Sequence, residues 1–482
     1  MDERTNMNSR MTRRELMRRV GMGAAGLAFS KASRLLGADK AQSKPNFIIV
    51  FCDDLGYGDL GCYGHPTIRT PNLDRMAAEG QRWTDFYVGA SVCTPSRAAL
   101  LTGRLPIRSG MCNDSRRVLF PDSAGGLPQG EITIAEALKG QGYTCACIGK
   151  WHLGHLPQYL PTHNGFDSFF GLPYSNDMDR VGGPQGRAAF WEPKSEYWNV
   201  PLMRNEQIIE WPADQNTLTK RYTEEAVRFI ERSKDRPFFL YLAHTMVHVP
   251  LFASDEFRGK SPRGLYGDTV EEIDWSVGRI LETLRREGLD RNTFVVFTSD
   301  NGPWLPYDQH GGSAGLLRDG KGCTFEGGMR EPCLMWWPGT IRPAAVHDLG
   351  TTMDLYTTIV KLAGGQPPTD RVVDGLDLRP VLYGKGPSPR DTVFYYRGTK
   401  LFAVRKGPYK AHFITQSGYG GDKPVEHDPP LLYHLDHDPS EKHDVSKDHP
   451  AAIAEILKEV QRHRQELVPG EDQLAERIKK DG

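Results

Sequence analysis

Hydrophobic positions in this chain fall into short continuous runs and into longer stretches with helical spacing. The runs are rich in β-branched and aromatic residues, as in strands buried in a parallel sheet. They occupy residues 47–51, 83–88, 143–148, 238–243 and 294–297. Helical stretches alternate with them, at residues 71–79, 95–101, 132–139, 217–233, 266–287 and 353–362. This alternation predicts an α/β fold whose mostly parallel sheet is covered by helices on both faces.

The pattern changes after Arg390. Short strand patterns separated by turns occupy residues 393–396, 402–405, 409–413 and 432–435, and a helical pattern follows at 451–467. They predict a smaller C-terminal antiparallel sheet with one helix. We therefore divide the chain into a leader at 1–43, a main α/β domain at 44–389 and a C-terminal α+β subdomain at 390–482. Residues 176–214, rich in glycine, proline and aromatic residues, are expected to form a long surface insertion.

The leader has its own composition. Arg13 and Arg14 precede a mildly apolar stretch at residues 20–30, and small residues follow near Ala38 and Ala41. This resembles a twin-arginine export signal and predicts a periplasmic or secreted protein. A disordered basic leader is the alternative. Charged residues interrupt the apolar stretch, which is therefore too short for stable membrane insertion.

Charge and cysteine content exclude several classes of function. The chain has 60 Lys and Arg against 61 Asp and Glu, so no overall basic field favours nucleic acid. An anionic substrate must therefore be attracted locally. The 8 cysteines include no CxxC pair that would suggest zinc, and they are too sparse for a disulfide scaffold.

Polar residues follow four of the predicted strands directly. They are Asp53 and Asp54, then Lys150 and His152, then His244 and His248, and finally Asp300 and Asn301. Ligands of α/β sheets bind at the carboxyl ends of the strands, so these side chains predict one common site. The two strand ends that carry only carboxylates and an amide offer oxygen ligands, which suit Ca²⁺ or Mg²⁺ and not zinc.

One motif identifies a family. The segment Cys93-Thr94-Pro95-Ser96-Arg97, followed by residues 98–104, resembles the signature of the formylglycine-dependent type I sulfatases. Three further stretches, at residues 149–154, 171–175 and 320–328, occur in the same order as in that family. The resemblance implies an alkaline-phosphatase-like fold and the hydrolysis of sulfate monoesters, of a sulfated carbohydrate or an aryl sulfate. It also implies that a separate formylglycine-generating enzyme oxidises Cys93 to formylglycine, and it favours Ca²⁺ as the metal.

The resemblance also implies a mechanism. One hydroxyl of the hydrated aldehyde attacks sulfur, and the second later expels sulfate. The residues that it implies for each task are Asp53, Asp54, Asp300, Asn301 and modified Cys93 for the metal; Lys150, Ser175, His248 and Lys321 for the substrate; Arg97 to hold the diol; and His152 and His248 to move protons. His244 is expected to support these groups.

Two other functions remain open at this point. A phosphomonoesterase or phosphodiesterase of the alkaline phosphatase superfamily would share the architecture, but it would need a Ser or Thr nucleophile and, with two zinc ions, further His and Asp ligands. A glycan-binding relative without activity would have lost site residues, and none is missing here. The substrate, its ring position, exo or endo action and the oligomeric state are not determined by the sequence.

Overall fold

The computed structural model describes residues 44–479, which contain a large mixed sheet. Its strand order is β10-β2-β9-β8-β1-β7-β3-β4-β5-β6. The bounds are β1 (Asn46–Cys52), β2 (Gln81–Tyr87), β3 (Thr144–Gly149), β4 (Ser168–Gly171), β5 (Leu202–Arg204), β6 (Gln207–Glu210), β7 (Phe238–Ala243), β8 (Thr293–Ser299), β9 (Cys333–Trp336) and β10 (Ala344–Thr351). The neighbours β8, β1, β7, β3 and β4 pair in parallel, whereas β9 and β5 are antiparallel to their neighbours. Five adjacent strands therefore end at the same edge.

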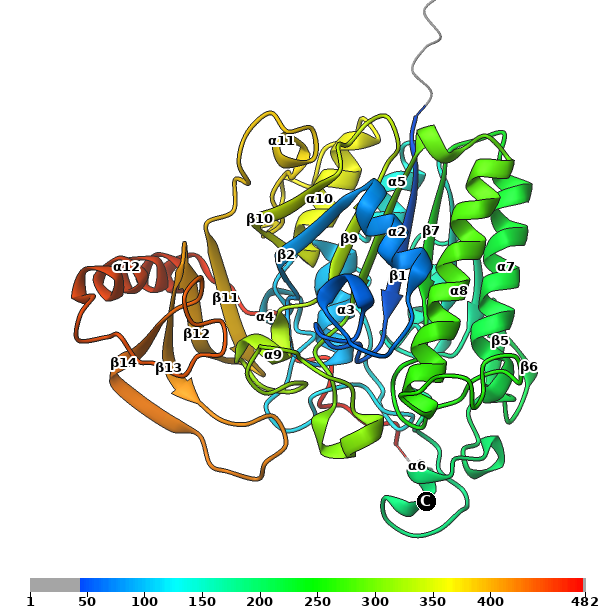
Figure 1. Cartoon of the computed structure of the whole chain (residues 1–482), viewed down its shortest axis with the longest axis horizontal. Coiled ribbons are helices and arrows are strands. Elements are labelled where there is room, and N and C mark those ends of the chain that lie inside the picture. Colours follow the sequence, from blue (N-terminus) through cyan, green and yellow to red (C-terminus); the bar gives the residue numbers. More distant parts are fainter. Residues whose placement is uncertain (1–43, 480–482) are drawn as a thin grey trace, which may run out of the picture. The chain divides into compact units, whose positions relative to one another are not determined.

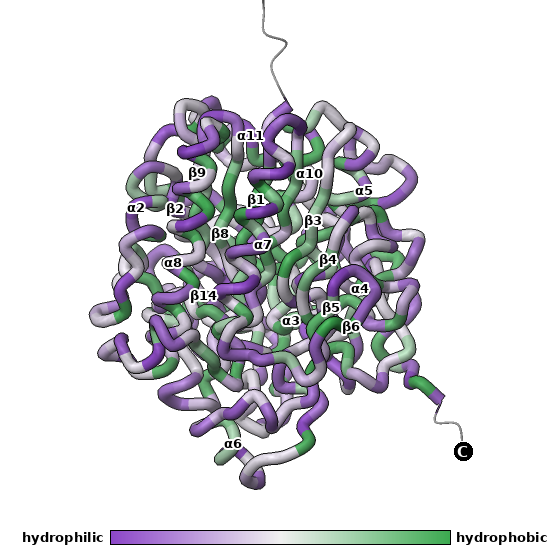
Figure 2. Tube along the Cα trace, turned by 90° about the vertical axis from the view of Figure 1, so that its right-hand side faces the viewer, coloured by the Kyte–Doolittle hydropathy of each residue, from purple (hydrophilic) through white to green (hydrophobic). Residues whose placement is uncertain are grey.

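Helices cover both faces of this sheet (Figure 1). Their bounds are α2 (Pro71–Glu79), α3 (Cys93–Thr102), α4 (Pro106–Ser109), α5 (Ile134–Lys139), α6 (Ala188–Trp191), α7 (Leu218–Ser233), α8 (Leu265–Arg286), α9 (Glu326–Met329), α10 (Thr352–Leu362) and α11 (Arg379–Leu382). Side chains of β1 alternate between two cores: Ile48 and Val50 pack with α2, α7 and α8, and Phe47, Ile49 and Phe51 with α3, α5 and α10. Figure 2 shows the hydrophobic segments gathered along these central strands. Burial on both faces explains their continuous apolar runs.

A second sheet, antiparallel and four-stranded, follows in the chain. It consists of β11 (Thr392–Arg397), β12 (Lys400–Lys406), β13 (Tyr409–Thr415) and β14 (Val425–His434), with α12 (Pro450–Glu466) packed against it. It appears in orange and red in Figure 1. Buried ion pairs join it to the main sheet region, among them Arg405 with Asp85 and Lys410 with Glu326. The predicted fold class, a mostly parallel sheet with helices and a smaller antiparallel sheet, is confirmed.

The structure differs from the sequence prediction in several strands of the large sheet. Residues 176–214 are only partly a surface insertion, because β5 and β6 lie within them at the edge of the sheet. Trp198 and Leu202 are fully buried there. The strands β4, β9 and β10 were also not predicted. The four residues of β4 and of β9 carry too little periodicity to be recognised before their partners are known. The eight-residue edge strand β10 was missed because His347, Asp348 and Gly350 interrupt its apolar pattern.

The expected export signal at residues 1–43 lies outside the described residues. Within residues 44–479, no helix combines the length and the apolar character that a membrane crossing requires. All eight cysteines belong to this part of the chain, and each is a free thiol there.

Candidate active site

The ends of five neighbouring strands bring most of the candidate residues together. Strand β1 leads to Asp53 and Asp54, and β8 leads to Asp300 and Asn301. On the other side of β1, strand β7 leads to His248, β3 to Lys150 and His152, and β4 to Ser175. All of these residues are buried. The carboxyl edge of the parallel strands therefore forms a site, as ligand sites in such sheets do.

Cys93 lies at the first position of α3, in the middle of these groups. Its thiol donates to Asp53 Oδ1 at 3.3 Å, and Lys321 Nζ lies 3.5 Å from its Sγ. Burial, together with Asp300 and Asp53, raises the pKa of the Cys93 thiol well above its ordinary value. A thiol that stays protonated is a poor nucleophile, so an unmodified Cys93 has little reactivity of its own.

Three cations and three carboxylates surround Cys93. Arg97 donates through Nε and Nη2 to Asp300 Oδ2, at 3.1 and 2.8 Å. Lys150 donates to Asp53 and to Ser175 Oγ, while Lys321 donates to Asp54 Oδ2 at 2.8 Å. With every group ionised, this set has no net charge. It therefore needs a further positive charge before it can attract an anion strongly.

The carboxylates of the site differ in pKa. Burial would raise the pKa of Asp53, but Lys150, His248 and Arg97 outweigh it and hold that pKa well below the ordinary range. Burial raises the pKa of Asp54 to about 7, and Asp53 and Asp300 add to the effect while Lys321 opposes it. Asp53 is thus held ionised by its cations, whereas Lys321 does not offset the burial of Asp54 and its two neighbouring carboxylates.

The donor set fits a hard cation. One ligand atom from each of Asp53, Asp54, Cys93 and His248 lies within 4.8 Å of the others. Asn301 donates through Nδ2 to Asp54 Oδ1 at 2.7 Å, but its own Oδ1 is buried without a hydrogen-bond donor. A buried amide oxygen without a donor is costly unless a cation takes that place. The oxygens of these carboxylates and this amide suit Ca²⁺ or Mg²⁺.

Two histidines present a free ring nitrogen. His152 Nε2 lies 2.8 Å from the carbonyl oxygen of Leu119, which can only accept, so the proton is on Nε2 and Nδ1 is left as an acceptor without a partner. His248 Nδ1 contacts the carbonyl oxygen of Val249, which leaves Nε2 facing Asp54 Oδ2 at 3.6 Å. The structure places His244 elsewhere: its Nε2 contacts Ser276 Oγ on α8, and burial lowers its pKa to about 3.

Sequence reasoning missed four residues around this site. The Trp304 ring lies 5.2 Å from that of His248 and 4.4 Å from Lys321 Nζ. Tyr419, on the loop between β13 and β14, packs against Trp304, and Arg117 and Asp177 line the adjoining cleft. Only the position of Trp304, three residues after Asn301 at a strand end, offered a signal. The others come from loops that no local pattern connects.

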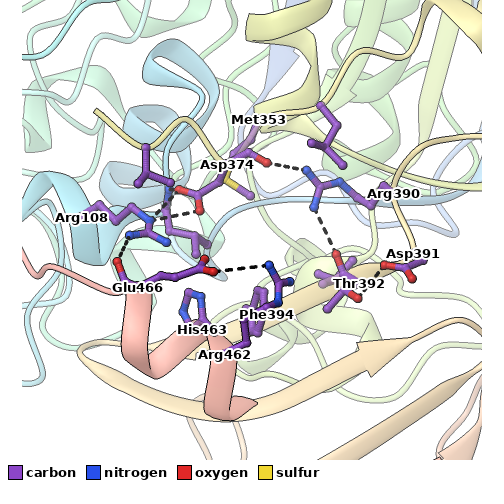
Figure 3. Close-up of a pocket in the computed structure, with 14 residues that line it drawn as sticks. Arg108, Met353, Asp374, Arg390, Asp391, Thr392, Phe394, Arg462, His463 and Glu466 are labelled. Carbon is purple, nitrogen blue, oxygen red and sulfur yellow. Dashed lines mark hydrogen bonds and ion pairs between the residues drawn. The ribbon is translucent and has the colours of Figure 1, made fainter. Parts of the chain in front are cut away.

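A separate cavity of about 210 Å³ lies between α4, β11 and α12 (Figure 3). Its arginines are already paired. Arg108 binds Asp374 at 3.1 Å, and Arg390 binds Asp354 and the carbonyl oxygen of Asp374. Because these arginines already have partners within the protein, they are not available to bind a ligand. The cavity is therefore a polar junction between the two sheets.

Comparisons with known proteins decide the family. The sulfatase family model matches residues 45–365, and the model for the C-terminal region of aryl-sulfatase matches residues 388–481. The chain belongs to the sulfatase family. Among its relatives, arylsulfatase A of Bos taurus is 45% identical over 435 residues, covering 84% of each chain. N-acetylgalactosamine-6-sulfatase of Mus musculus is 44% identical over 474 residues, covering 90% of this chain and 89% of that one.

A solved structure agrees with this relationship. The crystal structure of Ps i-CgsB in complex with k-i-k-neocarrahexaose has a TM-score of 0.75 and 31% identity, covering 90% of this chain and 96% of that one. This sulfatase is therefore a sulfuric ester hydrolase, and the resemblance of the Cys93 motif is confirmed. The phosphatase alternative is not favoured, because position 93 holds neither Ser nor Thr.

Proposed function

We propose that this sulfatase removes sulfate from a sulfated saccharide, using formylglycine made from Cys93 and a bound Ca²⁺ ion. The observation that carries the proposal is the position of Cys93. It begins α3 within hydrogen-bonding reach of both Asp53 and Lys321, in a site whose Asn301 amide oxygen lacks a donor. Maturation would require a separate formylglycine-generating enzyme.

Asp53, Asp54, Asp300 and Asn301 would hold the metal. Their oxygens come from two adjacent strand ends, and the residue at position 93 would complete the set. Ca²⁺ is the first choice, from the resemblance of the sequence, and Mg²⁺ the second. The bound cation would supply positive charge to a site that has none in excess, and it would polarise the oxygens of the sulfate group.

The other cations would position the sulfate. Formylglycine supplies a hydrated aldehyde, which offers one hydroxyl for attack on sulfur and another for release. Arg97 fixes the carboxylate of Asp300 through two hydrogen bonds and thereby keeps the first turn of α3 in place. Lys321 lies against Cys93, and Lys150 contacts Ser175. With the carboxylates of Asp53 and Asp54 engaged by a cation, Lys150, Ser175 and Lys321 would bind sulfate oxygens.

The two histidines would move protons. His152 has an acceptor nitrogen, Nδ1, with no partner, and this atom would take a proton during release of sulfate. His248 directs Nε2 towards the site beside Trp304, and a proton first taken up on Nε2 would be passed to the departing alcohol oxygen. His244 has no part in this scheme, because it contacts α8.

A saccharide is the substrate that the surroundings favour. A cleft of about 820 Å³ adjoins Cys93 through Val92, and it is lined by arginines, carboxylates and the exposed ring of Tyr419. Asp177 lines this cleft, and a carboxylate can accept from a sugar hydroxyl. The names of similar proteins point the same way, to an N-acetylgalactosamine-6-sulfatase and to a complex with k-i-k-neocarrahexaose. Export by the twin-arginine leader would deliver the enzyme to the periplasm or medium.

The test compares sulfate and phosphate esters of the same alcohol. Enzyme produced together with a formylglycine-generating enzyme should release sulfate from p-nitrophenyl sulfate and from sulfated disaccharides much faster than phosphate from p-nitrophenyl phosphate. A calcium chelator should abolish this activity, and added Ca²⁺ should restore it. Faster turnover of the phosphate, or full activity in metal-free enzyme, would overturn the proposal.

A further inference from the structure

The cleft beside Cys93 contains three arginines in different situations. Arg116 forms an ion pair with Asp122, and Arg477 lies 3.8 Å from the same carboxylate. Arg117 differs, because within residues 44–479 no carboxylate lies within ion-pair distance of it. Its Nη2 donates to the carbonyl oxygen of Gly322 at 2.8 Å, and its buried Nε has no acceptor.

Arg117 is also held close to the sulfate-binding lysine. It packs against Gly322, which follows Lys321 directly: a methyl group on Gly322 would lie 2.9 Å from Arg117 Nη2. The same methyl group would lie 2.9 Å from the ring of Tyr419, and Gly322 has a φ of +89°. Only glycine permits this approach, so the guanidinium packs on the backbone of the residue that follows Lys321.

Aromatic side chains fix the orientation of Arg117. Its guanidinium lies 5.5 Å from the centre of the Tyr419 ring, which in turn lies 5.3 Å from Trp304. Trp304 contacts Lys321 and His248. The Tyr419 loop comes from the second sheet and is tied down by a hydrogen bond from the Gly418 N–H to Asp319. A continuous surface thus leads from the sulfate-binding groups to one arginine without an acidic partner.

We propose that Arg117 binds a second anionic group on the saccharide whose sulfate ester is cleaved. This inference rests on the proposed function. A guanidinium binds a carboxylate or a sulfate with two parallel hydrogen bonds, and a half-buried arginine without a counter-ion gains most from such a partner. The second group is therefore either the carboxylate of a uronic acid or a further sulfate. Tyr419 supports the guanidinium through its ring face and borders the sugar.

Three disaccharides test this inference. The first carries one sulfate and a uronic acid, the second is its carboxyl-reduced counterpart, and the third is the reduced compound with a second sulfate. We expect wild-type enzyme to favour the first or the third over the second by about tenfold or more in kcat/KM, as for a charge-assisted hydrogen bond. Which of the two is favoured identifies the anionic group.

Variants connect this preference with Arg117. Arg117→Met should remove most of the preference, mainly through KM, and Arg117→Lys should retain part of it. Arg116→Met is the matched control, because Arg116 lines the same cleft but already has Asp122 as its partner; it should leave the preference unchanged. Thermal unfolding of each variant checks that it folds.

The outcomes separate this inference from the proposed function. Wild-type enzyme that cleaves all three disaccharides at equal rates, or an Arg117→Met variant that keeps the full preference, would overturn the inference alone. An enzyme that releases sulfate from none of the disaccharides and not from p-nitrophenyl sulfate would overturn both.

Discussion

Two buried clusters of charge in this protein use the same residue types for different ends. One lies between the two sheets, where Lys410 binds Glu326 and Glu441, each at 2.9 Å. The other is the active site, where Lys150 binds Asp53 and Lys321 binds Asp54. In both, the side chains are buried and oppositely charged groups are in contact. The two clusters differ in which buried polar atoms lack a hydrogen-bond partner.

In the cluster between the sheets, every carboxylate oxygen has a donor within the protein. Glu326 accepts from Tyr87, Tyr395 and Lys410, and Glu441 accepts from His412 and from the Glu326 N–H. In the active site, the Asn301 amide oxygen and the His152 Nδ1 atom have no donor. His412 Nδ1 in the first cluster also lacks a partner, so the two clusters differ in their oxygens. The carboxylate oxygens between the sheets are all satisfied and hold two parts of the fold together, whereas the active site has a buried amide oxygen that is prepared for a cation.

Replacement of Cys93 tests the catalytic role of the active-site cluster, and of all the replacements it should lower activity most. Cys93→Ala should reduce kcat by roughly a millionfold or to background, because the nucleophile is lost. Cys93→Ser should allow at most one slow sulfation, since a serine ester lacks the second hydroxyl. The control is Cys147→Ala on β3, which removes a buried thiol outside the site and should leave turnover intact. Steady-state turnover by either Cys93 variant would contradict the mechanism.

Replacement of Lys410 tests the opposite cluster. Lys410→Met leaves Glu326 and Glu441 buried without their shared cation, so the free energy of unfolding should fall by about 3–5 kcal/mol. Denaturant unfolding measures this change. Lys458→Met, which removes an exposed cation of α12, should change stability by less than about 0.5 kcal/mol. Equal stability of the two variants would show that the cluster does not hold the sheets together.

Acid should weaken the cluster between the sheets in a defined range of pH. Burial would raise the pKa of Glu326, but Lys410, Arg330 and Arg405 outweigh it and lower the pKa from 4.5 to about 2. Because the pKa is lower in the folded state, this stabilisation is complete above pH 4.5 and is lost as the pH falls towards 2. The loss is roughly 3 kcal/mol. Unfolding measured across this range should show a shallower slope in Glu326→Gln, and an unchanged slope would argue against the assignment.

Replacement of Asn301 tests the metal site in the active-site cluster, and we expect it to have the smallest effect of these replacements. Asn301→Ala removes a neutral ligand, so it leaves no buried charge behind. It should weaken calcium binding about 10- to 100-fold, as the loss of a supporting metal contact does, and excess Ca²⁺ should restore activity. Asn164→Ala removes a buried amide that binds Tyr159 and Leu160 elsewhere, so it should leave calcium affinity unchanged. Equal affinity in the two variants would remove Asn301 from the metal site.

The sequence could predict the site better than its surroundings. Asp53, Lys150 and Asp300 directly follow buried strands, and parallel pairing brings such positions together. Residues such as Arg117 and Tyr419 meet only through tertiary packing of distant loops, so no local pattern reveals them. His244 also follows a strand, but its side chain contacts Ser276 on α8 and not the site. The position of a residue after a strand does not fix the direction of its side chain.

The proposed mechanism requires an aldehyde at position 93 in active enzyme. Mass spectrometry of the peptide that contains residues 93–97, isolated from enzyme of known specific activity, tests it most directly. We expect a formylglycine mass at position 93, in a fraction of the peptide that rises in proportion to kcat among preparations. Fully active enzyme whose peptide carries an intact cysteine thiol would contradict it.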